Sequence, residues 1–98
     1  MYNWKEYKVN IGYVKEKTSR LVKFESTRPL DIQHISPGCS ECTKFIDYKD
    51  NVLTFRYDAS SFPIHLLPAK QTPIYKYVTV YYEDGSREEL TFIGFLTR

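Results

Sequence analysis

Three short segments decide the fold of this chain: Val22-Lys23-Phe24, Pro29-Leu30-Asp31-Ile32 and Cys39-Ser40-Glu41-Cys42-Thr43. The first two are apolar runs typical of β-strands, and the third is a tight turn that holds both cysteines of the chain. These segments allow two interpretations. Either the cysteine pair is a redox or metal site, or it marks a corner between two strands of a β-sandwich and has no chemical role.

Length and composition limit the possible architectures. The chain has 98 residues, which is enough for one domain, residues 1–98, with a two-layer core. Nine tyrosines and six phenylalanines favour half-buried β-sheet surfaces. The net charge of +2 is too small to indicate nucleic-acid binding by itself.

The beginning of the sequence bears on localisation. Residues 1–8 lack the apolar core of a signal peptide, and no apolar run approaches the ~20 residues that span a bilayer. We therefore expect a protein that is not secreted through a signal peptide and has no membrane partner. It would be cytoplasmic, or part of the virion if it is a phage protein. In the cytoplasm the two cysteines would be reduced rather than bridged.

Seven short apolar runs, separated by turn residues, predict seven β-strands. They cover about residues 6–14, 20–25, 30–35, 43–48, 51–57, 74–83 and 88–96. The apolar spacing in the third run implies a bulge or an early end. The proline-rich residues 58–68 predict a crossover with one helical turn. Asp84-Gly85-Ser86 predicts a hairpin between the last two strands. An antiparallel β-sandwich fits this spacing best, and an open barrel is the main rival.

Alternation within each run predicts which side chains share a face. The expected groups are Val9, Ile11 and Tyr13 in the first run, Val22 and Phe24 in the second, Leu53, Phe55 and Tyr57 in the fifth, and Ile74, Val78, Val80 and Tyr82 in the sixth. The opposite side of the sixth run then carries Tyr75, Tyr77, Thr79 and Tyr81. Tyr75, Tyr77 and Tyr81 are a possible interaction surface, because tyrosine provides contact area at low entropic cost. Cross-strand pairing that merely stiffens the sheet is an equally good explanation.

The CxxC spacing of Cys39 and Cys42 is compatible with redox chemistry or zinc. A thioredoxin-like thiol needs a helix N-terminus to lower its pKa, and Thr43 instead begins a predicted strand. Zinc would need two further ligands, for which His34 and His65 are the candidates. In the third interpretation, Cys39 and Cys42 are two reduced thiols packed in a turn. His34 then has a structural role. We expect no catalytic residue, no cofactor and no metal.

A family resemblance follows from these motifs. Val22-Lys23-Phe24, Pro29-Leu30-Asp31-Ile32 and the Cys39…Cys42-Thr43 corner are similar to the bacterial DUF1573 family, which belongs with the ASH/MSP-type immunoglobulin-like domains. Residues 53–58 resemble the family's strand that ends in an aromatic residue and Asp, and residues 90–94 resemble its closing strand. The similarity covers about residues 12–95. Ser26-Thr27-Arg28 replaces the family's usual Asn-Thr-Gly turn, and the corner reads CxxC rather than CxC.

The resemblance implies an immunoglobulin-like antiparallel β-sandwich of about seven strands, used for adhesion or assembly, with no catalytic residues. We expect a non-enzymatic structural module in a larger particle such as a phage virion, as a capsid decoration or tail accessory protein. Its partners would be capsid or tail proteins, not nucleic acid. Two alternatives stay open: a zinc- or redox-responsive module that uses Cys39 and Cys42, and a soluble regulatory binder of a host protein.

Overall fold

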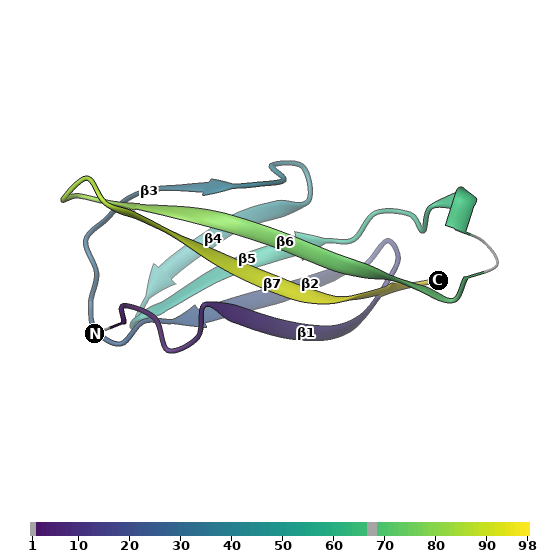
Figure 1. The fold of residues 1–98 in the computed structure, drawn as a ribbon, viewed down its shortest axis with the longest axis horizontal. Helices are drawn as coiled ribbons and strands as arrows, with labels where there is room; N and C mark the ends of the chain where they lie inside the picture. Colours follow the sequence, from purple (N-terminus) through teal and green to yellow (C-terminus); the bar gives the residue numbers. More distant parts are fainter. Residues whose placement is uncertain (1, 67–68) are drawn as a thin grey trace.

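The computed structural model describes residues 2–66 and 69–98, which form two facing β-sheets (Figure 1). The elements are β1 (Lys8–Lys15), β2 (Ser19–Glu25), β3 (Ile32–Pro37), β4 (Thr43–Lys49), β5 (Val52–Asp58), the 3₁₀ turn η1 (Ile64–Leu66), β6 (Gln71–Tyr82) and β7 (Arg87–Thr97). One sheet has the order β1-β7-β6-β3 and the other β2-β5-β4. The predicted all-β sandwich is confirmed, and all seven predicted strands lie close to their expected positions.

The hairpin between β6 and β7 joins the two longest strands, which run along the whole molecule (Figure 1). The amide of Tyr82 donates to the carbonyl of Ser86 over 2.9 Å, and the amide of Gly85 donates to the carbonyl of Tyr82 over 3.0 Å. Gly85 has a φ of +89°, a conformation that favours glycine. The hairpin predicted from Asp84-Gly85-Ser86 is therefore confirmed.

The prediction of a wholly antiparallel fold is wrong for one strand pair. β1 pairs with β7 in parallel, whereas the other four pairs are antiparallel. β1 and β7 lie at opposite ends of the sequence, so no hairpin sets their relative direction. Their direction follows from the path of the chain, which alternation within each strand does not reveal.

The core lies between the sheets, and the alternation predicted its members well. The buried apolar side chains are Trp4, Val14, Val22, Phe24, Leu53, Phe55, Tyr57, Ala59, Phe62, Ile74, Val78, Val80, Tyr82, Leu90, Phe92 and Leu96. All the residues expected to share a face in the second, fifth and sixth runs are among them. The first run is the exception.

A β-bulge in β1 causes this exception. Asn10 pairs with Ile93 and Tyr13 pairs with Phe95, so that Ile11 and Gly12 together lie opposite one residue of β7. The extra residue reverses the alternation. Tyr13, which we expected beside Val9 and Ile11, consequently points outward with 63% of its surface exposed.

Glycine at position 94 makes room for this bulge. A Cβ atom at Gly94 would lie 2.5 Å from the carbonyl oxygen of Gly12. Backbone atoms cannot yield as a flexible side chain can, so the bulge requires glycine there. The outward position of Tyr13 thus depends on a residue of β7.

The N-terminal segment connects the two sheets before β1 begins. Trp4 forms an antiparallel bridge with Ser26, and the amide of Lys5 donates to the carbonyl of Glu25 over 2.9 Å. Two residues later the carbonyl of Tyr7 accepts a hydrogen bond from the amide of Thr91 over 2.9 Å. The chain therefore pairs first beside β2 and then beside β7.

Candidate interaction surface

The outer side of the four-stranded sheet carries four exposed aromatic side chains. Tyr13 and Tyr75 are exposed to 63% and 60%, and Tyr77 and Phe95 to 42% and 38%. The rings of Tyr13 and Phe95 stack with their centroids 5.7 Å apart. We call Tyr13, Tyr75, Tyr77 and Phe95 the aromatic face.

Strand register makes the aromatic face continuous. Phe95 lies between Tyr13 and Pro73 in the register of β1, β7 and β6. One step along the strands, the half-buried Ile93 lies between Asn10 and Tyr75. Cross-strand neighbours of this kind lie about 5 Å apart, so these side chains form one surface.

The CxxC turn begins at the border of this surface. The amide of Gly38 donates to the carbonyl of Tyr77 over 2.9 Å. The Tyr77 ring lies over Gly38, because a Cβ atom there would be only 2.7 Å from the ring's Cζ. The position of the Tyr77 ring therefore depends on the turn that follows β3.

Two of the three predicted surface tyrosines lie together on the aromatic face. Tyr75 and Tyr77 are exposed there, whereas Tyr81 is half-buried at the end nearer the hairpin. The ring of Tyr81 lies beside that of His34, with centroids 5.9 Å apart. Tyr13 and Phe95 complete the surface and were missed. Gly12 within a predicted strand was the available signal, since an interior glycine often marks a bulge.

The exposed aromatic area is comparable to the largest apolar patch on a typical monomer. With about 200 Å² for each aromatic side chain, the exposed fractions correspond to about 400 Å². The largest apolar patch on a typical monomer is about 300–600 Å² and often has a function.

The outer side of the three-stranded sheet differs in chemistry. Its outward residues include Leu21, Lys23, Lys44, Arg56 and Asp58, all from β2, β4 and β5. Arg56 and Asp58 form an ion pair with Nε and Oδ1 3.0 Å apart. This sheet combines charged residues with exposed apolar ones, because Leu21 on β2 is exposed to 56% and Phe45 and Ile46 on β4 to 48% and 46%.

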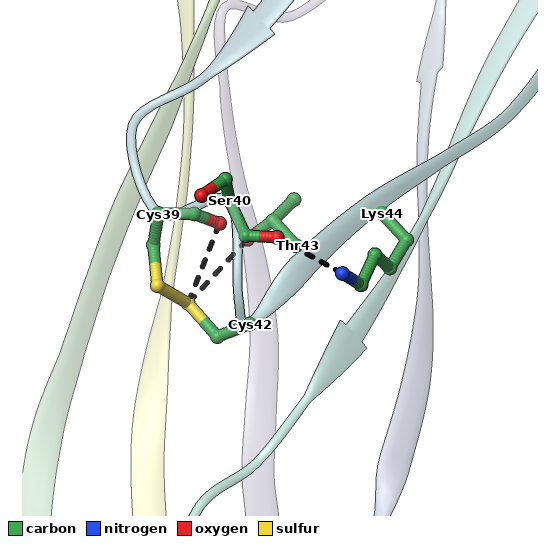
Figure 2. Close-up of a disulfide and its surroundings, with 5 residues drawn as sticks. All are labelled: Cys39, Ser40, Cys42, Thr43 and Lys44. Carbon is green, nitrogen blue, oxygen red and sulfur yellow. Dashed lines mark hydrogen bonds between the residues drawn. A yellow bond between two sulfur atoms is a disulfide. The ribbon is translucent and has the colours of Figure 1, made fainter.

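The two cysteines form a disulfide in the turn between β3 and β4 (Figure 2). The expectation of two reduced thiols is therefore wrong. The amide of Thr43 donates to the carbonyl of Cys39 over 3.0 Å, and β4 begins at Thr43. No helix follows the pair, in agreement with the predicted strand. Figure 2 shows Lys44 reaching back across the turn, where its Nζ donates to the carbonyl of Ser40 over 3.1 Å.

The structure does not bring together the four hypothesised zinc ligands. Over residues 2–66 and 69–98, no three His, Cys, Asp or Glu side chains are placed to hold a metal ion. His34 lies on β3 beside Tyr81, and His65 lies in η1. The cysteine sulfurs are bonded to each other rather than available as thiolate ligands.

A hydrogen-bond network around Glu88 was not anticipated from the sequence. Its Oε1 accepts from the hydroxyl of Tyr82 over 2.6 Å and from Nδ2 of Asn3 over 2.7 Å. Its Oε2 accepts from the hydroxyl of Tyr7 over 2.7 Å. The indole N–H of Trp4 donates to the same Tyr82 hydroxyl over 2.8 Å. The network ties the N-terminal segment to β6 and β7.

These contacts shift the ionisation of the network. Burial by itself would raise the pKa of the Glu88 carboxyl, but the three hydrogen bonds donated to it outweigh that effect. The pKa of Glu88 therefore lies below its ordinary value. Burial, together with the hydrogen bond to Glu88, raises the pKa of Tyr82 well above that of free tyrosine. Both shifts favour an ionised Glu88 carboxylate that accepts hydrogen bonds from neutral hydroxyls. Such a network stabilises the structure.

Comparison with protein-family models, with curated proteins and with solved structures finds no match to this chain. No helical segment in the described part of the chain has the length and apolar character to cross a bilayer.

Proposed function

We propose that this chain is a non-enzymatic assembly module with an immunoglobulin-like fold, which binds a protein partner through its aromatic face. Immunoglobulin sandwiches place strands A, B, E and D in one sheet and C, F and G in the other. The orders β2-β5-β4 and β7-β6-β3 match B-E-D and G-F-C. The segment around Trp4 pairs beside β2, as strand A does, before the chain continues into β1. These correspondences support the immunoglobulin-like assignment.

The observation that carries the proposal is the unequal chemistry of the two outer sides. About 400 Å² of aromatic surface lies exposed on the four-stranded sheet, whereas the three-stranded sheet presents lysine, arginine and aspartate together with the exposed Leu21, Phe45 and Ile46. Single exposed apolar side chains are normal on a protein surface, but a contiguous patch of this size often has a function. A binding role for Tyr75 and Tyr77 accounts for this difference between two sheets of the same molecule.

Within this proposal, the particle is a phage virion and the chain decorates its capsid or belongs to its tail. The disulfide supports a virion location over the cytoplasm. Disulfides persist on virions and other extracellular surfaces and are rare in the reducing cytosol. Cys39 and Cys42 then serve to hold the turn beside Tyr77.

A capture experiment with two matched variants tests the proposal. Tyr75 and Leu21 are exposed to 60% and 56% on opposite outer sides, so Tyr75→Ser and Leu21→Ser remove similar exposed apolar groups. Immobilised wild-type protein and both variants are incubated with extract from the native source, and the retained proteins are identified by mass spectrometry. We expect Tyr75→Ser to lose a virion protein that wild type and Leu21→Ser both retain. Identical retention by all three proteins would contradict a binding role for the aromatic face.

The disulfide favours a second candidate function, a redox-responsive module. Reduction would free the turn that contacts Tyr77 and would thereby change the aromatic face. The test compares partner binding by wild type, with and without reductant, against a Cys39→Ser/Cys42→Ser variant. Binding that responds to reductant in wild type and not in the variant supports this function. If wild type and the variant bind the partner equally, with and without reductant, this second function is ruled out.

A further inference from the structure

We infer that the open edge of the sandwich between β3 and β4 binds an extended segment of another protein, which adds to β4 as a further strand. This site is separate from the aromatic face and goes beyond the proposed function. Three features of the edge support it: an exposed apolar groove, a strand edge without hydrogen-bond partners and a regular order of charges.

Inward-facing side chains are exposed where β3 and β4 lie side by side (Figure 1). Phe45 pairs with the fully buried Phe55, so its side chain points toward the core, yet it is exposed to 48%. Ile32 and Ile35 pair with buried residues of β6 and are themselves only half-buried. These three side chains and Tyr48 line a groove of about 410 Å³. The core is therefore open to solvent along this edge.

The opposite edge of the sandwich, between β1 and β2, is closed by the chain itself. There the guanidinium of Arg20 donates to the carbonyls of Ile11 and Tyr13 on β1, over 2.6 and 2.9 Å. The N-terminal segment pairs beside β2 through the bridge between Trp4 and Ser26. Within residues 2–66 and 69–98, the backbone of residues 32–36 and 44–48 makes no hydrogen bond other than strand pairing. Only the edge with the groove is therefore left open.

β4 offers the better edge for a further strand. It ends the order β2-β5-β4, so the backbone groups on its far side lack strand partners. Ile46 is the extra residue of the bulge between Phe45 and Asp47, which leaves it outside the ladder with β5, and it is exposed to 46%. β3 is less suitable because it contains Pro37, which has no N–H to donate. An extended peptide that pairs with β4 places alternate side chains in the groove.

The outward charges of β4 define the chemistry of the partner. Lys44, Asp47 and Lys49 lie opposite every second residue of β5, so they form a regular row of positive, negative and positive charge. None of the three forms an ion pair within the described part of the chain. Cross-strand pairs of opposite charge stabilise a sheet. A segment with acid, base and acid at alternate positions and apolar residues between them matches all three charges, whereas a second copy of β4 matches at most two.

Two synthetic peptides of opposite charge order test the site. Val-Glu-Val-Lys-Val-Glu-Val matches β4 in either strand direction, because its sequence reads the same both ways. Val-Lys-Val-Glu-Val-Lys-Val has the charges exchanged. Each peptide is titrated into the protein up to millimolar concentration, and the amide resonances are followed by NMR. We expect the first peptide to shift the amides of residues 44–48 and to bind about tenfold more tightly than the second.

Matched variants of the protein separate the site from net charge and from general apolar binding. Asp47→Lys opposes the central lysine of the first peptide and should weaken its binding about tenfold. Glu83→Lys, in the exposed turn between β6 and β7, changes the net charge equally and should leave binding unchanged. Phe45→Ser removes part of the groove and should weaken binding, whereas Leu21→Ser on β2 should not.

Each outcome decides a separate statement. If neither peptide shifts the amides of β4, strand addition at this edge is overturned. If both peptides bind β4 equally well, the acid–base–acid chemistry of the partner is overturned. If the protein dimerises without peptide and Asp47→Lys abolishes the dimer, the occupant is a second copy and not another protein. The proposed function is tested separately, because Tyr75→Ser alters the aromatic face and leaves the groove intact.

Discussion

The two outer sides of the sandwich cover the same core from opposite directions, yet they carry different side chains. The four-stranded sheet exposes Tyr13, Tyr75, Tyr77 and Phe95, whereas the three-stranded sheet exposes lysine, arginine and aspartate together with Leu21, Phe45 and Ile46. Folding requires only that the inward residues be apolar, and both sheets satisfy that equally. The difference between the outer sides therefore reflects something other than the stability of the single chain.

The aromatic side also depends on more supporting structure than the charged side. The β1 bulge at Gly12 turns Tyr13 outward, and Gly94 makes room for the bulge. Gly38, at the start of the disulfide turn, lies under the Tyr77 ring. On the other outer side, plain alternation places the outward residues of β2 and β5, and a bulge between Phe45 and Asp47 interrupts β4. Substitutions in these supports should consequently alter one side and leave the other intact.

The largest effect is expected from Gly94→Ala. The new Cβ would meet the backbone of Gly12, so β1 and β7 must separate locally, at a cost of about 3 kcal/mol of unfolding free energy. Urea denaturation measures this cost. Gly38→Ala is the control, because its Cβ meets only the exposed Tyr77 ring, which can move. We expect it to cost less than about 1 kcal/mol. Equal losses in the two variants would show that the bulge does not constrain β7.

The Glu88 network should make stability fall in acid. Because the folded pKa of Glu88 is depressed, the stabilisation is complete above the ordinary glutamate pKa and is lost as the pH falls through the folded value. Glu88→Gln should cost about 2 kcal/mol at neutral pH and should flatten this acid dependence. Denaturation across the acid range, with the exposed Glu83→Gln as control, measures both. If Glu88→Gln loses stability in acid as wild type does, the acid dependence comes from other carboxyl groups.

Removal of the disulfide should have a smaller and more local effect. Cys39 and Cys42 close a loop of only four residues, so Cys39→Ser/Cys42→Ser should cost no more than about 2 kcal/mol. In an NMR comparison, resonances of Gly38 and Tyr77 should shift, and those of Leu21 and Lys23 should not. Shifts spread over both outer sides would mean that the turn supports the whole sandwich rather than one edge of the aromatic face.

The smallest effect on stability is expected for Tyr75→Ser, and it separates binding from sheet stiffening. If Tyr75 serves a partner, its loss in the monomer should cost less than about 0.5 kcal/mol, as little as Leu21→Ser on the other side. If cross-strand pairing explains the tyrosines, the loss should approach about 1 kcal/mol. Denaturation at a concentration where the protein is monomeric compares the two variants.

Much of the fold could be predicted because alternation is a local property. Leu53, Phe55 and Tyr57 alternate with outward residues inside one strand, and their burial followed directly. The position of Tyr75 and Tyr77 opposite Val78 followed in the same way. Tyr13 did not, because the bulge that turns it outward involves a glycine more than eighty positions away.

The network around Glu88 was hidden for a similar reason. Two of its three donors, Asn3 and Tyr7, precede β1, and Glu88 lies in the last strand. Nothing in the spacing of these residues indicates that the N-terminal segment would cross from β2 to β7. The disulfide was also mispredicted, because the expectation came from the assumed compartment and not from the geometry of the turn.

The sequence by itself determined the seven strands, the hairpin at Asp84-Gly85-Ser86 and the inward residues of most strands. Each of these depends on neighbours within a few positions, where side-chain periodicity and turn preference act directly. The tertiary structure alone decided the parallel pairing of β1 with β7, the outward turn of Tyr13 and the joining of Tyr13, Phe95, Tyr75 and Tyr77 into one surface. Those features depend on contacts between distant strands, and they give the two outer sides of the sandwich their different chemistry.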